Sequence, residues 1–438
     1  MVNRSPLQLN DDFRQALDLL EKTDNHLFIT GKAGTGKSTL LQLFRNTSHK
    51  KIAVLAPTGV AALNVQGQTI HSFFGFPPRI LTTGEAARKV TRKDLLRIYK
   101  NLEVLVIDEI SMVRADLLDG IDKFLRVNRE SFRPFGGVQV VFFGDLFQLP
   151  PVVTRDPVES AYFNEYYESP YFFSGKIFGD DDFQIETLEL RKVYRQESRH
   201  FLRLLEAVRL NEIDFDDLED LNERYNPAFS ETEGYITLCA RNVTADKINQ
   251  RELSLLTTPE FEFVAEVKGQ FDPGLYPADF GLRLRKGAQV MFVRNDIEER
   301  KFVNGTIGKI THLDQHAIIV ETEEQHGKRR RIEVAKSEWE IIRYKGGDSG
   351  GLETEVVGSF TQYPLRLAWA ITIHKSQGKT FDKVLIDLGG GAFEHGQLYV
   401  ALSRCRTLEG VVLRHRIRPQ DVITDERVVE FYEKRFRV

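Results

Sequence analysis

Short apolar runs alternate with amphipathic stretches over the first third of the chain. Residues 26–30, 51–56, 104–107 and 138–143 are apolar runs of strand length. Helical spacing of apolar residues lies before and between them, at residues 12–20, 39–44, 57–62 and 88–99. Because strands that alternate with helices indicate a parallel sheet, this part is predicted to be an α/β domain.

The same alternation returns later in the chain. Strand patterns at residues 184–190, 235–240, 383–387 and 411–413 are separated by helical patterns, notably at 201–210 and 244–255, and predict a second α/β domain. Between about residues 271 and 363 the pattern changes to short β segments and turns, which predicts a small all-β insert. We therefore expect three units, at residues 1–175, at residues 176–270 with 364–438, and at residues 271–363.

The most informative stretch follows the first predicted strand. Gly31 to Ser38 reads Gly-Lys-Ala-Gly-Thr-Gly-Lys-Ser and matches the phosphate-binding pattern G-x-x-x-x-G-K-[ST]. Glycines allow a tight turn whose N–H groups, with the next helix N-terminus, converge on a polyphosphate. Lys37 should reach the β- and γ-phosphates, and the Ser38 hydroxyl a Mg²⁺ ion. The expected nucleotide contacts are Gly31, Ala33, Gly34, Thr35, Gly36, Lys37, Ser38 and Thr39.

Two adjacent carboxylates follow the strand pattern at residues 104–107. Asp108 is expected to hold the Mg²⁺, and Glu109 to orient and deprotonate an attacking water. Taken alone, such a pair also suits a helix cap or a turn. Gln148 comes shortly after the strand at 138–143, where a polar group can sense the γ-phosphate, although by itself it is an ordinary loop residue. The combination predicts an enzyme that hydrolyses a nucleoside triphosphate.

Composition excludes several classes of protein. The chain has 438 residues, of which 41% are hydrophobic and 28% charged, as in ordinary globular proteins. The net charge of −4 means that a nucleic acid would need a local basic channel. Cys239 and Cys405 have no metal-ligand spacing and suit buried packing in a reducing compartment. Without a stretch of about 20 apolar residues or a signal-peptide core, a cytoplasmic protein without a membrane partner is expected.

Aromatic and basic segments are candidates for nucleic-acid contact. Residues 68–76 combine hydroxyls, an imidazole and three phenylalanines, which suits a single strand because rings stack on bases and hydroxyls contact phosphates. A hydrophobic cluster beneath a loop is the alternative. The basic run from Lys328 to Arg331 is either a solvated hairpin end or a nucleic-acid contact. The aromatic stretch at 162–178 is expected to join the two domains.

In their order and composition these motifs resemble those of the Pif-type DNA helicases, on the RecD-like, 5′-to-3′ branch of helicase superfamily one. The matching segments cover nearly the whole chain and lie at residues 31–38, 56–76, 104–113, 143–151, 190–196, 370–378 and 399–404. The aromatic block at 171–178 resembles the stretch that distinguishes the Pif branch from its relatives. The chain looks like a bare, bacterial-type helicase core.

The resemblance implies two RecA-like domains with the nucleotide between them, and an SH3-like fold for the β insert. Arg195 and Arg404 match the arginines that reach the phosphates from the second domain and neutralise transition-state charge. The family often places a glutamine near the start of the chain where Phe13 stands here, with Gln8 nearby. This departure leaves the preference among nucleotides open.

By the same resemblance, a DNA single strand runs past both domains. Residues 64–78 would form the pin that splits a duplex. Because phosphate contacts dominate such paths, binding should depend on salt and be nearly indifferent to sequence. The expected contacts are Thr58, Asn64, His71, Ser72 and Phe73 in the first domain, and His374, Lys375 and Ser376 in the second.

The activity that the resemblance implies is ATP- and Mg²⁺-dependent stepping, 5′ to 3′, on single-stranded DNA. The expected substrates are duplex, forked or four-stranded guanine DNA, the expected processes are DNA repair, recombination and telomere maintenance, and the free protein is expected to be a monomer. One alternative is a nucleotide-dependent clamp that remodels protein–DNA complexes without separating strands. Another is a metabolic kinase that uses a polyphosphate substrate.

Overall fold

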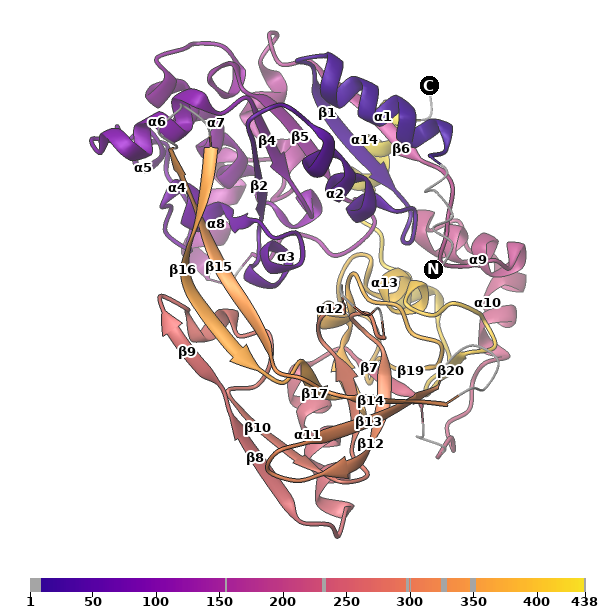
Figure 1. Cartoon of the computed structure of the whole chain (residues 1–438). Coiled ribbons are helices and arrows are strands. Elements are labelled where there is room, and N and C mark those ends of the chain that lie inside the picture. The colour runs from indigo at the N-terminus through magenta and orange to yellow at the C-terminus, as the bar shows by residue number, and fades with distance from the viewer. Residues whose placement is uncertain are drawn as a thin grey trace.

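The computed structural model describes residues 9–153, 156–230, 234–296, 299, 301–323, 329–346 and 352–436. Gln8 and Lys328, both singled out in the sequence, lie outside the described residues. The described part contains two parallel and three antiparallel sheets (Figure 1). Within these ranges no helix has both the length and the apolar character that a bilayer crossing needs.

The first domain is built on a parallel sheet with the strand order β3-β2-β4-β5-β1-β6. Its strands are β1 (His26–Gly31), β2 (Ile52–Ala56), β3 (Gln68–Thr69), β4 (Val104–Ile107), β5 (Gln139–Phe143) and β6 (Ile185–Leu190). β6 pairs with β1 along its whole length. Residues 184–190 were expected in the second domain, so the predicted boundary after residue 175 is wrong. An apolar run shows that a strand exists, but the sheet that it joins depends on contacts far away in the chain.

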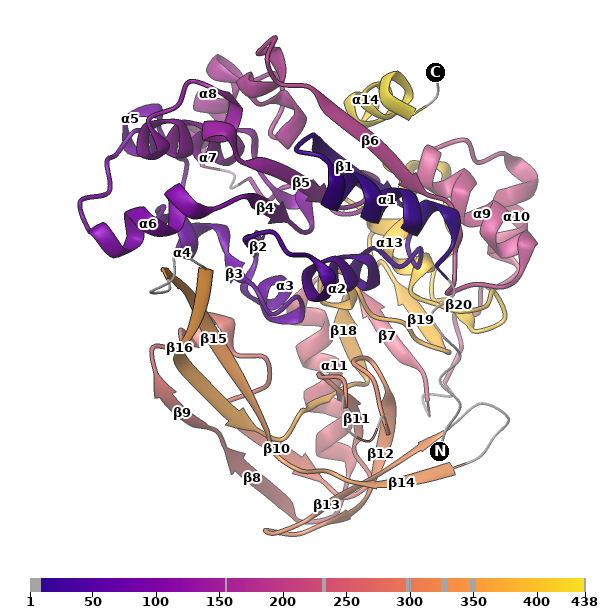
Figure 2. The same cartoon turned by 45° about the horizontal axis from the view of Figure 1, so that its top comes forward.

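Helices cover both faces of this sheet, which is why its strands are almost continuously apolar. On one face α1 (Asp11–Lys22) and α2 (Lys37–Thr47) pack Phe13, Leu20 and Phe44 against Leu27 and Ile29 of β1 (Figure 2). The other face is covered by the larger core. The other helices of this domain are α3 (Gly59–Asn64), α4 (Ile70–Phe74), α5 (Thr83–Ala86), α6 (Lys93–Asn101), α7 (Ala115–Arg129) and α8 (Pro157–Tyr166).

The end of the chain returns to the first domain. Helix α14 (Glu426–Phe436) lies beside β6 in Figure 2. The ring of Phe431 stacks on Phe173 with centroids 4.5 Å apart, and the Tyr432 hydroxyl donates to Glu189 of β6 at 2.8 Å. Residues 426–436 therefore pack with the first domain, and their predicted assignment to the second domain is wrong. Phe173 therefore packs within the first domain, and the aromatic stretch reaches the second domain through Tyr171, whose ring centroid lies 6.1 Å from that of His395.

The second domain has a parallel sheet with the order β18-β7-β19-β20, which confirms the predicted second α/β domain. The strands are β7 (Ile236–Cys239), β18 (Ala370–Thr372), β19 (Val384–Asp387) and β20 (Val411–Leu413). Leu204 and Leu398 belong to one core that continues from the first sheet to the second. Ala245 packs on the opposite face. The helices are α9 (Arg199–Leu210), α10 (Phe215–Asn222), α11 (Asn242–Leu255), α12 (Ile373–Ser376) and α13 (Gln397–Ser403).

The β part is larger than predicted. Its antiparallel sheets have the orders β14-β13-β12-β11-β17, β15-β16-β9 and β10-β8, and they span residues 260–367 rather than 271–363. The early strands had no clear turn signal before them, and their partners come much later in the chain, as when Glu266 of β9 pairs with Thr361 of β16. The strands are β8 (Glu260–Val264), β9 (Glu266–Gly269), β10 (Gly281–Arg285), β11 (Gln289–Phe292), β12 (Ile307–Leu313), β13 (Ile318–Glu323), β14 (Arg329–Glu333), β15 (Ser337–Gly346), β16 (Leu352–Gln362) and β17 (Leu365–Leu367).

In the described part of the basic run, Arg329 and Arg331 pair with Glu321 across the β13–β14 ladder, at 3.2 and 3.4 Å. These contacts favour the solvated hairpin over a nucleic-acid contact.

The long hairpin β15–β16 connects the β part to the first domain. Figure 1 shows it rising from the β part towards α4 and α6. The Tyr344 hydroxyl accepts a hydrogen bond from the Val54 N–H at 2.9 Å, and its ring meets Phe73 edge to face at 5.6 Å. Tyr344 is buried by these contacts. The hairpin therefore continues the first domain's core into the β part.

The aromatic segment at 68–76 belongs to the core of the first domain. Its two-residue strand β3 pairs with β2 at the edge of the sheet, and Phe73 and Phe74 are buried among aromatic side chains of α6 and α7. The burial of Phe73 and Phe74 agrees with the alternative of a hydrophobic cluster, while the pin at residues 64–78 stays a prediction. The ring of Phe73 is enclosed by Phe74, Tyr99 and Tyr344, so its predicted stacking on a DNA base is wrong.

Candidate active site

The phosphate-binding pattern forms the expected loop between β1 and α2. Gly36 caps α2 with φ of +88°, a conformation that favours glycine. Gly34 has φ of +82°, and a Cβ atom there would lie 2.5 Å from the Cβ of Arg195. The Thr35 hydroxyl donates to the Lys32 carbonyl at 2.9 Å and steadies the turn. The glycines thus permit both the turn and the close approach of the chain segment that carries Arg195.

Lys37 lies inside this loop. Its Nζ donates to the carbonyl oxygens of Gly31 and Lys32 at 2.5 and 3.1 Å. Burial lowers the pKa of Lys37, while the charges of Asp145 and Glu109 oppose that shift. Ser38 and Thr39 are exposed on the first turn of α2. The ammonium group and the Ser38 hydroxyl thus lie where the pattern predicts a triphosphate and its cation.

Asp108 and Glu109 stand at the end of β4. Asp108 is buried, and burial with the neighbouring charge of Glu109 raises its pKa to about 7. Burial also raises the pKa of Glu109, whose backbone has φ of +52°, a strained conformation for a non-glycine residue. Two crowded carboxylates whose charges act on Lys37 of the phosphate loop offer hard oxygen ligands, so these residues fit Mg²⁺.

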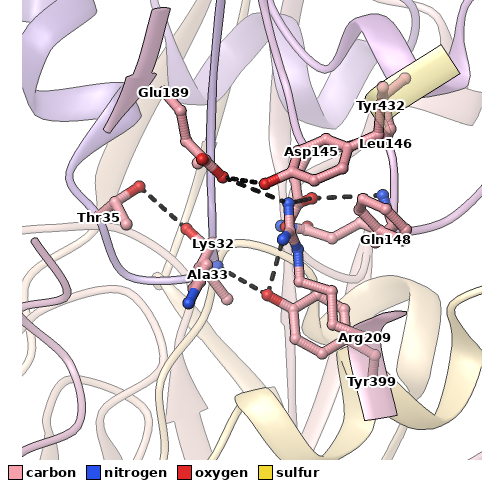
Figure 3. Close-up of polar contacts among 12 residues, drawn as sticks. Lys32, Ala33, Thr35, Asp145, Leu146, Gln148, Glu189, Arg209, Tyr399 and Tyr432 are labelled. Atoms are coloured by element: carbon pink, nitrogen blue, oxygen red, sulfur yellow. Dashed lines mark hydrogen bonds and ion pairs between the residues drawn. The ribbon is translucent and has the colours of Figure 1, made fainter. Parts of the chain in front are cut away.

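A buried network links the loop after β5 to the phosphate loop (Figure 3). The Tyr399 hydroxyl accepts the Ala33 N–H at 3.0 Å and donates to Asp145 Oδ2 at 3.3 Å. The Gln148 amide donates to the same carboxylate oxygen at 3.1 Å, which places Gln148 in the site as predicted. Asp145 and Tyr399 were not predicted. Their places in the sequence could have indicated them, because Asp145 lies close to Gln148 and Tyr399 lies close to Arg404.

Arg209 completes this network as its buried cation. Its guanidinium lies 3.4 Å from Asp145 Oδ1 and stacks over the Phe147 ring, with Cζ 4.3 Å from the ring centroid. Burial would lower the pKa of Arg209, but Asp145, Tyr399, Glu206 and Tyr432 together outweigh burial and raise it. An arginine on an amphipathic helix usually reaches solvent, so the sequence carried no signal for this one.

The two predicted arginine fingers lie together at the site. Arg195 donates to the Ser403 carbonyl at 2.9 Å, and Arg404 Nε donates to the Val400 carbonyl at 2.9 Å. Burial, reinforced by the charge of Arg404, lowers the pKa of Arg195 to about 9, and burial lowers that of Arg404 to about 10. Arg195 belongs to the segment between the two sheets rather than to the second sheet itself, and it contacts the phosphate loop directly.

Two aromatic residues flank the phosphate loop. A Cβ atom on Gly36 would lie 2.9 Å from the Phe13 ring and 3.9 Å from the Tyr194 ring. The Tyr194 N–H donates to the Gly34 carbonyl at 2.9 Å, and its side chain is 49% exposed. Phe13 is where the sequence placed it, whereas Tyr194 was missed, although an aromatic residue directly before Arg195 was a usable signal.

The predicted DNA contacts fall into two groups. Thr58, Asn64 and Ser72 are exposed in the first domain, where Thr58 and Ser72 cap or accept hydrogen bonds from neighbouring residues. His71 is partly buried. In the second domain Lys375 is exposed on α12, and His374 is partly exposed and pairs with Glu394 at 3.1 Å.

Ser376 is fully buried and its hydroxyl donates to the Ile373 carbonyl at 2.6 Å, so its predicted contact with the strand is wrong. The hydroxyl caps its own short helix. A serine between exposed residues gave no indication of that role.

Comparison with known proteins identifies the family. The model of the PIF1-like helicase family matches residues 8–218, and that of the UvrD-like helicase C-terminal domain matches residues 367–412. The ATP-dependent DNA helicase Pif1 of Bdellovibrio bacteriovorus is 33% identical over 439 residues, which cover 98% of this chain and 92% of that protein. The chain belongs to the PIF1-like helicase family. The predicted resemblance is thereby confirmed.

Further relatives and solved structures agree. Human ATP-dependent DNA helicase PIF1 is 34% identical over 93% of this chain and 60% of that protein. Pif1 from Bacteroides sp in complex with ADP-AlF4 superposes with a TM-score of 0.89 at 37% identity, covering 98% of both chains. The same Bacteroides protein bound to ssDNA superposes with a TM-score of 0.69 at 38% identity, covering 98% of this chain and 97% of that one. The chain thus superposes better on the ADP-AlF4 complex than on the ssDNA complex.

Proposed function

We propose that this chain, an ATP-driven DNA helicase by family, steps 5′ to 3′ along single-stranded DNA and separates paired strands, with Mg²⁺ as cofactor. One observation carries the proposal: Lys37, Glu109 and Gln148 of the first domain meet Arg404 of the second domain around one buried site. Hydrolysis there can change the relation of the two domains. The polarity rests on the family alone.

The chain's own residues divide the work of hydrolysis. The phosphate loop and Lys37 bind the β- and γ-phosphates, and Ser38 and Asp108 hold Mg²⁺, which neutralises phosphate charge when bound. Glu109 accepts the proton of the attacking water, and burial, which raises its pKa, makes its carboxylate a stronger base. Arg195 and Arg404 stabilise the charge that develops on the phosphoryl group.

The nucleobase is proposed to lie by Phe13 and Tyr194. Both rings adjoin Gly36, and Tyr194 keeps an exposed face for stacking. Stacking holds any purine ring and hardly distinguishes adenine from guanine. Weak selectivity agrees with Phe13 standing where the family often has a glutamine. We therefore propose that ATP is the physiological nucleotide and that other purine triphosphates are accepted.

The single strand is proposed to contact the exposed predicted residues of both domains. Thr58 follows β2 and caps α3, and Lys375 lies on α12 directly after β18, so both stand at the carboxyl ends of parallel strands. Asn64, His71, Ser72 and His374 extend this path. The solved relatives include Bacteroides Pif1 bound to ssDNA and a structure that describes DNA unwinding at forked dsDNA by two coordinating Pif1 helicases, which supports the same partners here.

The remaining predictions stay proposals. They are activity on four-stranded guanine DNA, a monomeric free protein, a cytoplasmic location, and roles in DNA repair, recombination and telomere maintenance.

The test is ATP hydrolysis with and without single-stranded DNA at two salt concentrations, in the wild type and in Glu109→Gln. We expect stimulation by DNA that weakens at high salt and disappears in Glu109→Gln. Duplexes with a 5′ or a 3′ single-stranded tail then test strand separation, and only the 5′-tailed duplex should be unwound. Stimulated hydrolysis without unwinding of either duplex would favour the clamp, and hydrolysis indifferent to DNA would refute the partner.

A further inference from the structure

A short segment of the second domain holds the catalytic groups of the first. The Gln377 side chain donates from Nε2 to Glu109 Oε2 at 3.1 Å and to Gln148 Oε1 at 3.3 Å. One amide thereby engages both the proposed general base and the proposed γ-phosphate sensor. Arg404 is turned to the same segment, with Nη1 at 3.5 Å from the Ser376 carbonyl and 3.4 Å from the Lys379 carbonyl.

These contacts occupy the groups that hydrolysis needs. The Gln377 amide donates to both oxygens, so an attacking water has to share Glu109 Oε2 and Gln148 Oε1 with it. Arg404 donates to backbone carbonyls where a finger would donate to a phosphoryl oxygen. The segment 376–379 thus restrains three groups at once.

The same segment ends the helix proposed to meet DNA. Gln377 directly follows α12, whose His374 and Lys375 are partly or fully exposed. Gly378 comes next with φ of +77°, and a Cβ atom there would meet nothing within 4 Å. Gln377 therefore lies between α12, which is proposed to meet DNA, and a glycine with open space beside its Cα atom. Because Gln377 directly follows α12, a small movement of α12 displaces the Gln377 amide.

We propose that Gln377 is a positioning residue that restrains Glu109 and Gln148 in the DNA-free protein and releases them when a single strand engages α12. The arrangement of the chain supports a DNA-free state, since the Bacteroides relative superposes with a TM-score of 0.88 when unliganded and 0.69 when bound to ssDNA. This inference rests on the proposed function, because it takes Glu109 as the base and α12 as part of the strand path.

The variants Gln377→Met and Gln377→Ala test the restraint. Gln377→Met nearly keeps the length of the side chain and removes both donors, whereas Gln377→Ala removes the contact altogether. Losing a hydrogen bond to a charged carboxylate should release Glu109 and raise the rate of DNA-free hydrolysis roughly tenfold in both variants, a change that corresponds to about 1.4 kcal/mol and is close to what such a bond contributes. The rate at saturating oligo(dT) should stay near that of the wild type, so the stimulation by DNA falls. The dissociation constant for a fluorescent oligo(dT) should not change.

Gln420→Met is the matched control, because Gln420 is exposed on a different surface segment and should leave every rate unchanged. A general structural defect would lower both rates, so a rise in the DNA-free rate alone distinguishes restraint from damage. The inference is overturned if Gln377→Met lowers the DNA-free rate or leaves it unchanged, or if oligo(dT) binding weakens with it. Wild-type hydrolysis that DNA does not stimulate would instead refute the proposed function itself.

Discussion

Replacing the buried cation Arg209 should strongly destabilise the fold where the second domain packs on the first. Arg209 of α9 and Asp145 of the first domain have fully buried side chains, 3.4 Å apart. Arg209→Gln leaves the buried Asp145 carboxylate with its hydrogen bonds from Tyr399 and Gln148 but without the Arg209 charge, and removing one partner of such a pair costs about 3–5 kcal/mol. For a domain of this size that corresponds to a fall of roughly 6–20 °C in the thermal midpoint.

The assay is thermal unfolding without nucleotide, followed by calorimetry or tryptophan fluorescence. Arg14→Gln is the control, because Arg14 also pairs with an aspartate, Asp11, but the two side chains are 66% and 99% exposed. Its midpoint should hardly move. The double variant Asp145→Asn, Arg209→Gln should recover part of the loss, since no unpaired charge then remains buried. Equal shifts for Arg209→Gln and Arg14→Gln would refute the reasoning.

Three further predictions concern stability and nucleotide binding. Burial, with a smaller contribution from Arg133, lowers the pKa of His26 to about 4, and its Nδ1 accepts the Val140 N–H. As the pH falls, His26 is protonated in the unfolded chain before it is protonated in the folded protein. The stability that the neutral His26 contributes is therefore complete above about pH 6.5 and is lost as the pH falls towards 4. Between pH 7.5 and 5 the loss should be about 2 kcal/mol, visible as a lower thermal midpoint that His26→Gln makes less dependent on pH. Tyr344→Phe leaves the Val54 N–H unpaired and should cost about 1–3 kcal/mol, read as faster proteolysis of the β15–β16 hairpin, whereas an unchanged cleavage rate would show that the hydroxyl is dispensable. Tyr194→Ala removes the proposed stacking partner and should raise the KM for ATP roughly tenfold with little change in kcat; a loss confined to kcat would contradict a role in base binding.

The parts of this protein that could be predicted from sequence are those whose determinants are close together in the chain. The loop from Gly31 to Ser38 lies between a strand and a helix as expected, because spacing and glycine conformation are local properties. The same holds for Asp108 and Glu109 at the end of β4. Both carry their chemistry in two to eight consecutive residues.

What could not be predicted depends on contacts between distant residues. β6 joins the first sheet, although the segments that follow it belong to the second domain. α14 packs beside β6, although the segments that precede it belong to the second domain. Gln377 meets Glu109 across 268 residues, and nothing in its neighbourhood of the sequence indicates the encounter. Phe73 shows the converse case, since residues suited to stacking on bases suit a buried aromatic core equally well.

The return of α14 has a mechanical consequence. The backbone crosses between the two domains twice, near residues 191–198 and again near 424–425, and a body attached at two points can swing about the line through them but cannot spin freely. Both crossings adjoin the nucleotide site. At the first, the Tyr194 N–H donates to the Gly34 carbonyl. At the second, His395 donates from Nε2 to the Leu146 carbonyl at 2.8 Å, and its Nδ1 accepts the Asp425 N–H. The site therefore lies close to both crossings, so a rearrangement of the groups around the nucleotide acts directly on the two backbone connections between the domains.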